Sequence, residues 1–142
     1  MTKEQKIIYL AGLFDGEGCV LINKATKRRY SYHRLRVQLT NLNPSPLKMA
    51  MELFGGSILI HKNRRENQQD IWDWSVEYTR AVEFLEEIFP YSIIKKDEIE
   101  IALDFMNSKK RYGRGGVPIN EFRKRERFKQ ELQELKRQPY LM

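Results

Sequence analysis

The sequence predicts an α+β fold in which helices cover one face of a four-stranded antiparallel sheet and leave the other face free. After a first helix, a strand–strand–helix unit occurs twice, at about residues 19–54 and 57–89. Residues 32–41 and 71–78 alternate between apolar and polar side chains, as strands with one buried face do. At 142 residues, the chain is long enough for one domain with a proper core, so we expect residues 1–142 to form a single domain.

The first element in the chain is predicted at residues 7–18, IIYLAGLFDGEG, as a short apolar helix. Gly12 and Gly16 lie four residues apart and therefore on one helix face, where they leave a strip on which a partner backbone could pack closely. Asp15 and Glu17 follow at the point where Gly16 and Gly18 end the helix. These acids could form a metal site at an interface between chains, or could simply cap a turn.

Two strands are predicted next, at residues 19–24 and 32–41, joined by a polar, basic turn at residues 25–31. The second strand alternates between an apolar face and a face of hydrogen-bonding side chains without an acid. Such a face suits base edges and phosphates, although an exposed strand face often serves only solubility. The polar face carries Tyr32, Arg34, Arg36, Gln38 and Thr40, and the apolar face carries His33, Leu35, Val37 and Leu39.

A helix is predicted from Asn43, as the cap, to Gly55, with Pro44 in its first turn. Strands follow at residues 57–65 and 71–78, with a polar loop at 63–70. The regular alternation around Trp72 and Trp74 favours packing in the core over stacking on bases. Thr79 is expected to cap the third helix, which ends at Pro90. The apolar faces of these two helices are predicted at Leu47, Ala50, Met51 and Phe54, and at Val82, Leu85, Ile88 and Phe89.

Two further helices are predicted at residues 91–106 and 120–138, joined by a basic loop at 107–116. Lys95 and Lys96 in the first turn of the former oppose the helix dipole, which calls for an explanation; a solvated lysine pair is the ordinary one. The inward side chains are predicted as Ile99, Ala102, Leu103 and Met106. The last helix has a thin apolar stripe at Phe128, Leu132 and Leu135. We expect it to pack marginally and to meet phosphates through Arg123, Lys124 and Arg127.

The positive charge is unevenly distributed along the chain. Residues 1–108 carry 15 basic and 15 acidic side chains, whereas residues 109–142 carry 11 basic and 4 acidic ones. Between Lys24 and Arg65 there are ten Lys or Arg, with Glu52 as the single acid. Segregated positive charge favours a polyanion as partner, although a merely soluble basic protein is the alternative.

The cysteine content and the apolar runs indicate where the protein works. Cys19 is the single cysteine and cannot form a disulfide within the chain. The apolar run at residues 7–14 is too short to span a bilayer. We therefore expect no membrane partner and no secretion, and a location in the cytoplasm of a prokaryote or in an organelle.

Residues 10–18, LAGLFDGEG, resemble the motif of the LAGLIDADG homing endonucleases, with Phe14 and Gly16 as mild variations. The predicted order of elements is also the αββαββα order of that family. The resemblance covers about residues 5–106, which leaves the basic loop and the C-terminal helix of residues 107–142 outside it. It implies a saddle-shaped sheet along the DNA major groove. The implied activity is that of a site-specific homing endonuclease making metal-dependent double-strand cuts.

The resemblance also implies roles for individual residues. Glu17 matches the metal-binding acid of the motif. Together with the Gly16 backbone carbonyl it would hold Mg²⁺, or Mn²⁺ or Ca²⁺, since hard cations suit oxygen ligands. Lys95 matches a basic residue near the cleavage site, with Lys96 as the fallback, and Asn41 matches a polar residue near the water network. The implied catalytic residues are therefore Glu17, Lys95 and Asn41.

One motif copy per chain implies a homodimer and a long, partly palindromic DNA target. The expected dimer interface is Leu10, Gly12, Leu13, Asp15 and Gly16, with Asp15 bracing the turn. The expected DNA-binding residues are Asn23, Tyr32, Arg34, Arg36, Gln38, Thr40, His61, Asn63, Asp73, Ser75 and Lys96.

Three alternatives stay open at this point. One is a non-cleaving maturase that binds its intron RNA, and another is a DNA-binding regulator on the same scaffold. The third is a protein-interaction module, against which the polar face at residues 32–40 argues. Glu17 and Lys95 together favour an enzyme, because binding alone needs neither. The small size, without a splicing domain, favours an intron-encoded or free-standing gene.

Overall fold

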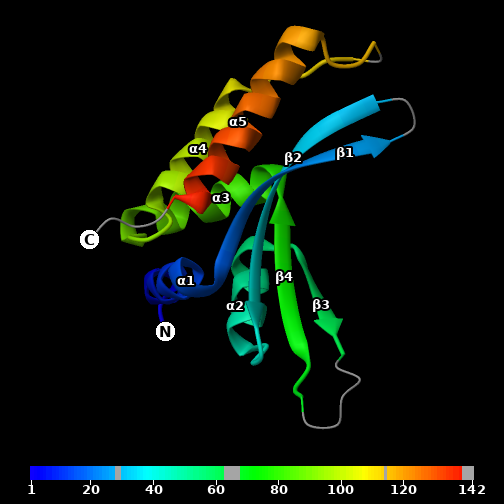
Figure 1. Ribbon diagram of the computed structural model, residues 1–142. Coiled ribbons are helices and arrows are strands. Elements are labelled where there is room, and N and C mark those ends of the chain that lie inside the picture. The colour runs from blue at the N-terminus through cyan, green and yellow to red at the C-terminus, as the bar shows by residue number, and fades with distance from the viewer. Residues whose placement is uncertain (28–29, 63–67, 114, 139–142) are drawn as a thin grey trace.

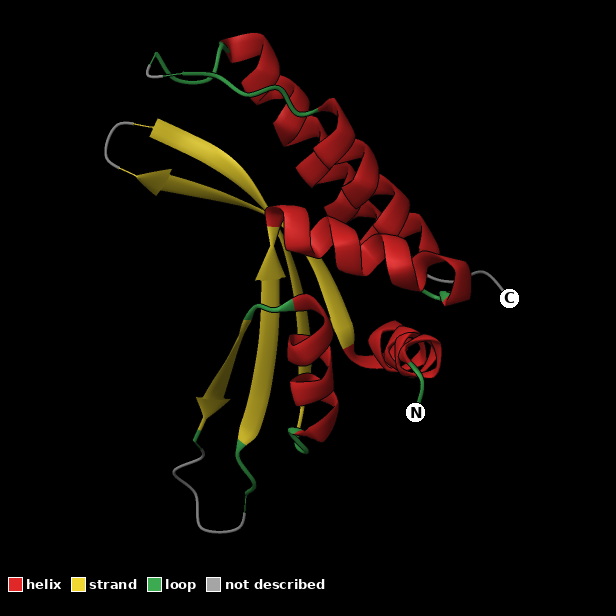
Figure 2. Cartoon of the chain, turned by 180° about the vertical axis from the view of Figure 1, so that it is seen from behind, coloured by secondary structure: helices red, strands yellow, loops and turns green. Residues whose placement is uncertain are grey.

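A computed structural model describes residues 1–27, 30–62, 68–113 and 115–138. Four strands form one antiparallel sheet in the order β1-β2-β4-β3, and the helices lie on one side of it (Figures 1 and 2). This confirms the predicted α+β fold with one free sheet face. The elements are α1 (Lys3–Glu17), β1 (Gly18–Lys27), β2 (Tyr30–Asn41), α2 (Ser45–Phe54), β3 (Ser57–His61), β4 (Ile71–Glu77), α3 (Tyr78–Ile88), the 3₁₀ helix η1 (Phe89–Tyr91), α4 (Lys96–Ser108) and α5 (Ile119–Arg137).

The hairpin formed by β1 and β2 is longer than predicted, because residues 25–27 and 30–31 continue the strands instead of forming a turn. Ala25 pairs with Tyr32 and Lys27 with Tyr30. The β-branched Thr26 is compatible with an extended backbone, and its hydroxyl lies 3.3 Å from that of Ser31. Since β4 pairs only with residues 36–41 of β2, the rest of the hairpin extends beyond the sheet as a two-stranded arm (Figure 1).

The core lies between the sheet and the helices and is centred on Phe84 of α3. The rings of Phe14, Phe54 and Trp74 each meet the Phe84 ring edge-on, with centroids 5.1–5.3 Å apart. Edge-to-face contacts of this kind add to the stability gained from burying apolar area. Trp74 is fully buried, and its indole N–H donates to the Gly55 carbonyl at 2.8 Å. Trp74 is therefore a core residue, as the alternation predicts.

Several predicted helix ends and inward residues are wrong by a few positions. The residue preceding α2 is Pro44, although the Asn43 side chain accepts the Ser45 N–H at 2.9 Å. Helix α3 begins at Tyr78, whose φ of 52° turns the chain sharply out of β4, so Thr79 is not its cap. Helix α4 begins at Lys96 instead of residue 91; η1 ends at Tyr91, and the N–H groups of residues 93–95 donate to Asp15. Met51, expected in the core, is 37% exposed.

Helix α5 packs more extensively than its thin apolar stripe predicts. It lies beside α4 and also contacts β1 and β2 (Figure 1). Besides Leu132, it buries the charged pair Glu121 and Arg125, which bond to the backbone N–H and carbonyl of Lys110. Fully buried His33 of β2 lies 2.6 Å from the Glu126 carboxylate. Charged side chains, which the hydrophobic pattern ignores, therefore supply much of this interface.

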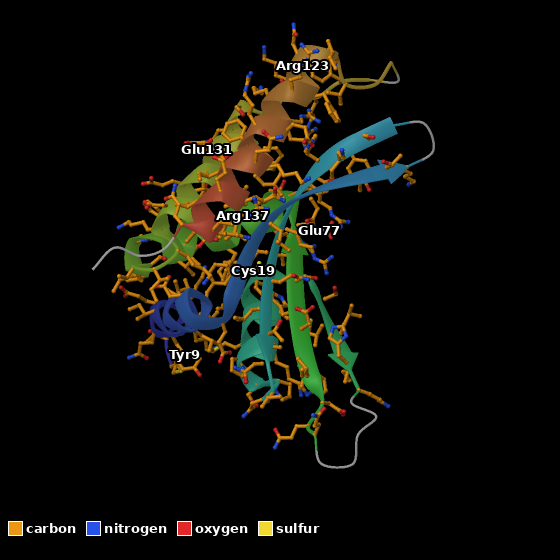
Figure 3. All side chains as sticks on the ribbon, viewed as in Figure 1. Tyr9, Cys19, Glu77, Arg123, Glu131 and Arg137 are labelled. Carbon is orange, nitrogen blue, oxygen red and sulfur yellow. The ribbon has the colours of Figure 1, made fainter. Side chains whose placement is uncertain are left out.

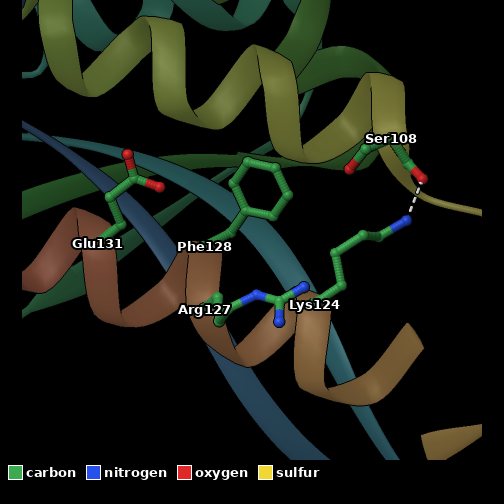
Figure 4. A pocket seen from close by; sticks show the side chains of 5 residues that line it. All are labelled: Ser108, Lys124, Arg127, Phe128 and Glu131. Carbon is green, nitrogen blue, oxygen red and sulfur yellow. Dashed lines mark hydrogen bonds between the residues drawn. The ribbon is translucent and has the colours of Figure 1, made fainter. Parts of the chain in front are cut away.

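Lys124, expected to meet phosphates, is instead engaged within the chain. Its ammonium lies 2.7 Å from Glu121 and donates to the Ser108 carbonyl at 2.5 Å. It lines a hollow of about 300 Å³ between α4 and α5, together with Arg127, Phe128 and Glu131 (Figure 4).

Within the described residues, no helix is both long and apolar enough to cross a membrane.

Candidate active site and DNA-binding face

Glu17 is the last residue of α1 and is exposed at the start of β1. The Asn41 side-chain amide donates to one of its carboxylate oxygens at 2.7 Å. The Asn41 oxygen in turn accepts the Asn43 N–H at 2.9 Å, which fixes the orientation of the amide. The two residues meet because Gly18 pairs with Leu39, so that the start of β1 lies beside the end of β2. Among the described residues, the second Glu17 oxygen forms no hydrogen bond or ion pair, and the side chain is exposed.

Asp15 has the opposite environment, since it is only 8% exposed. Its carboxylate accepts the Ser92 hydroxyl at 2.6 Å and the N–H groups of Ile93, Ile94 and Lys95 at 2.7–3.2 Å. Burial alone would raise the pKa of Asp15, but these four hydrogen bonds outweigh it and hold the pKa below its ordinary value. Asp15 therefore ties the end of α1 to the segment that leads into α4.

The same contact positions Lys95 at the end of α1. The Lys95 ammonium donates to the Asp15 carbonyl at 2.9 Å and lies 6.0 Å from the centre of the Phe14 ring. Glu17 follows Asp15 by two residues, so the acid and the ammonium project from one end of the helix. The Lys96 ammonium lies over the Phe89 ring at 5.1 Å instead. Of the two lysines, Lys95 is the one that contacts the motif.

Helix α1 also carries an exposed strip without side chains. Gly12 and Gly16 are both exposed, and a methyl group added to either would find no neighbouring atom within 4 Å. Ile8 and Tyr9, 44% and 48% exposed, precede Gly12 by about one turn and extend this exposed face toward the start of the helix. Tyr9 is labelled in Figure 3. Leu13 is half-buried, but Leu10 is fully buried in the core of its own chain. The expectation that Leu10 lies at a dimer interface is therefore wrong, since a partner could not reach it.

The free face of the sheet brings together most of the expected DNA-binding residues. Strand register places Asn23 opposite Arg34, Gln38 opposite Ser75, and Thr40 opposite Asp73. His61 lies on the same face, whereas Lys96 does not belong to the sheet, and Asn63 lies outside the described residues. Strand alternation also places on this face Cys19, Leu21, Leu59, Ile71 and Glu77. The alternation predicted for residues 71–78 already puts Ile71 and Glu77 beside Asp73, and the other three could have been found by extending the same period of two to β1 and β3.

Side chains on this face contact one another across the strands. Arg34 forms an ion pair with Glu77 at 3.4 Å, at the end of β4 that adjoins the two-stranded arm (Figure 3). The Arg36 guanidinium donates to the Ser75 hydroxyl at 3.4 Å. Asp73 accepts weak hydrogen bonds from Gln38 and Thr40. The face therefore combines cationic donors near the arm with an acid further along β4.

Comparison of sequences assigns a family to this arrangement. A sequence model described as LAGLIDADG endonuclease matches residues 10–100, from the first motif residue into α4. A search of curated protein sequences found no match.

Solved structures share the fold. The homing endonuclease I-CvuI, in complex with the I-CreI target and 2 mM Mg, is 17% identical, with a TM-score of 0.73 over 98% of this chain and 87% of that one. I-CvuI is also known in complex with its target in the presence of 2 mM Ca. The archaeal intron-encoded homing endonuclease I-Vdi141I, complexed with DNA, is 18% identical, with a TM-score of 0.75 over 98% and 89% of the two chains. The homing endonuclease I-TnaI is 18% identical, with a TM-score of 0.55 over 92% and 98%.

Proposed function

Because this chain belongs to the LAGLIDADG endonuclease family, we propose that it is a site-specific DNA endonuclease that works as a homodimer. The observation that carries the proposal is the arrangement at the end of α1. There an exposed Glu17 is oriented by Asn41, and the Lys95 ammonium is bonded to the Asp15 carbonyl at the same end of the helix. The DNA complexes of I-CvuI and I-Vdi141I support duplex DNA as the substrate.

The bare strip on α1 supports the homodimer. Two copies of α1 can approach closely where Gly12 and Gly16 carry no side chains, and exposed Ile8 and Tyr9 supply apolar area beside them. A two-fold axis through such a contact brings the two Glu17 carboxylates to adjacent positions and matches a partly palindromic target. Leu13 is half-buried and can contribute, whereas Asp15 supports the interface from inside its own chain.

The donors at this end of α1 fit a hard divalent cation. The free oxygen of Glu17 and the Gly16 carbonyl are oxygen ligands of the kind that Mg²⁺, Mn²⁺ and Ca²⁺ take. Within the described part of one chain, no three His, Cys, Asp or Glu side chains gather into a metal site, so the remaining ligands would come from the partner chain and the DNA. Bound there, the cation would lower the pKa of the attacking water and stabilise the leaving oxygen of the phosphodiester.

The protein's own groups have distinct parts in this reaction. Glu17 would supply a carboxylate oxygen to the cation beside the scissile phosphates, and Asn41 fixes its other oxygen through a hydrogen bond of 2.7 Å. The Lys95 ammonium, anchored to the Asp15 carbonyl, stabilises negative charge that develops on the phosphate oxygens. Arg34, Arg36 and their neighbours on the free sheet face select the target sequence from the major groove.

A plasmid assay tests the proposal. A plasmid carrying the DNA that flanks the gene in its host, joined without the gene, is incubated with the protein and Mg²⁺ or EDTA. We expect linear product with Mg²⁺ alone. Glu17→Gln should lower cleavage by about a hundredfold or more while binding to the same site survives.

Each other outcome identifies a different function. Specific binding of the site without cleavage by the unmodified protein under any divalent cation would indicate a DNA-binding regulator. A preference for folded intron RNA over the duplex would indicate a maturase. Equal cleavage by the unmodified protein and the Glu17→Gln variant would exclude the proposed role of Glu17.

A further inference from the structure

Asp73 is an acid on the sheet face that, under the proposed function, meets DNA. It lies in the middle of β4, and its side chain is 14% exposed. Among the described residues its one ion-pair partner is His61, at 3.7 Å. Glu77, the other β4 acid on this face, is compensated by Arg34 at 3.4 Å. An acid without a strong cationic partner weakens the binding of a polyanion, unless the DNA itself offers it a donor.

The hydrogen bonds around Asp73 use the donors of its neighbours. The Gln38 amide N–H donates to one carboxylate oxygen at 3.5 Å, and the Thr40 hydroxyl donates to the other at 3.4 Å. Both bonds are long, and a carboxylate has about four acceptor positions, so Asp73 keeps acceptor capacity. The Gln38 carbonyl oxygen and the Thr40 lone pairs are also acceptors. These three side chains therefore form an acceptor cluster, consisting of Gln38, Thr40 and Asp73.

Two arginine side chains lie next to this cluster, on the side toward the two-stranded arm. Gln38 is followed toward the arm by Arg36 and then Arg34 on the same face of β2. Guanidinium groups are donors only, and they suit the O6 and N7 acceptors of guanine. The free face thus has a donor region at Arg34 and Arg36 next to the acceptor cluster. The two regions adjoin because Arg36 and Gln38 lie two residues apart on the same face of β2.

We propose that the acceptor cluster of Gln38, Thr40 and Asp73 recognises the exocyclic N4 amino group of a cytosine in the major groove, once in each half of the target. The inference rests on the proposed function. Cytosine carries this donor and no acceptor of its own in the major groove, whereas adenine carries the N7 acceptor next to its N6 amino group. Thymine and guanine would direct an oxygen at the carboxylate.

Selection from random DNA tests the inference. The full-length protein is incubated with a randomised duplex pool in Ca²⁺, and bound molecules are sequenced for the unmodified protein, Asp73→Asn and Asp104→Asn. We expect a cytosine preference at one position per half-site that Asp73→Asn reduces about tenfold or more, with the other positions unchanged. Asp104 is exposed on α4, so Asp104→Asn makes the same chemical change away from the sheet and should leave every preference intact.

A modified base provides a test that does not depend on any variant. At the selected position, cytosine is replaced by 2-pyrimidinone, which lacks the amino group and stays opposite the same guanine. The affinity of the unmodified protein should fall about tenfold, whereas that of Asp73→Asn should hardly change.

Failure of the inference can be told apart from failure of the proposed function. Specific binding with the same preferences in the unmodified protein and Asp73→Asn, or full affinity for 2-pyrimidinone, would overturn the inference alone. Binding without any sequence preference in the unmodified protein would overturn the proposed function together with it.

Discussion

Two acids of one short motif, Asp15 and Glu17, have different physical roles because they face different surroundings. Asp15 is buried and accepts four hydrogen bonds, whereas Glu17 is exposed and accepts one from Asn41. A carboxylate that is fully engaged in this way holds the backbone in place. A carboxylate with a free oxygen at the surface can bind a cation. Their burial and hydrogen bonding therefore assign a structural role to Asp15 and leave Glu17 as the proposed catalytic residue.

The lowered pKa of Asp15 predicts how stability depends on pH. The folded state binds the proton of Asp15 more weakly than the unfolded chain, so its contribution is complete above the unfolded pKa of about 4 and is lost as the pH falls through the folded pKa. Asp15→Asn should therefore cost about 1–3 kcal/mol at about pH 7, with a smaller cost below about pH 4. Urea unfolding from about pH 3 to 7 measures this, with exposed Asp104→Asn as the control. A cost that is the same at every pH would contradict this explanation.

Motif residues could be assigned from the sequence, but their partners could not. The motif predicts Glu17 directly, and the start of the helix expected at residues 91–106 predicts Lys95. The Asn41–Glu17 hydrogen bond joins residues 24 positions apart, and it depends on how β1 and β2 pair. The four donors to Asp15 belong to a segment that the sequence predicts as helix, because nothing local indicates that a carboxylate from α1 satisfies its N–H groups.

At the scale of elements, α5 shows where hydrophobic periodicity fails as a guide. Its apolar positions predict marginal packing, yet Glu121 and Arg125 are buried at 6% and 4% exposure. Burial alone would raise the pKa of Glu121, but hydrogen bonds from Lys124, the Lys110 N–H and Arg125 hold it below its ordinary value. The strands and most helices were predictable because they alternate or repeat regularly. The contacts of α5 were not, since charged residues are usually expected in solvent.

The buried pair predicts a large loss of stability from a single change in α5. Arg125→Ala removes one donor to Glu121, which keeps Lys124, and the donor to the Lys110 carbonyl, and should cost about 1.5–3 kcal/mol of unfolding free energy. Arg123→Ala, at an exposed position of the same helix, should change it by no more than about 0.5 kcal/mol. Urea unfolding of both variants measures the difference. Equal and small effects would show that α5 contributes little to the fold.

At the scale of the whole molecule, two surfaces that other elements of the described chain do not cover meet at the end of α1. One is the free sheet face with its arginines and the acceptor cluster, and the other is the bare strip of Gly12 and Gly16. The sheet face was predictable from alternation along β2 and β4. The strip was predictable from the spacing of the glycines. Leu10 was assigned to the interface wrongly, since it lies two residues before Gly12 and therefore on the other side of the helix, which faces the core.

The number of chains on one DNA molecule tests the central claim most directly. Native mass spectrometry of the protein with a duplex carrying its target should give two chains per duplex for the unmodified protein. A Cβ added at Gly12 meets no atom of its own chain within 4 Å, so Gly12→Leu should fill the strip, leave unfolding nearly unchanged and prevent the two-chain complex. A single unmodified chain per cleaved duplex, or two chains with Gly12→Leu, would contradict a shared site built on paired α1 helices.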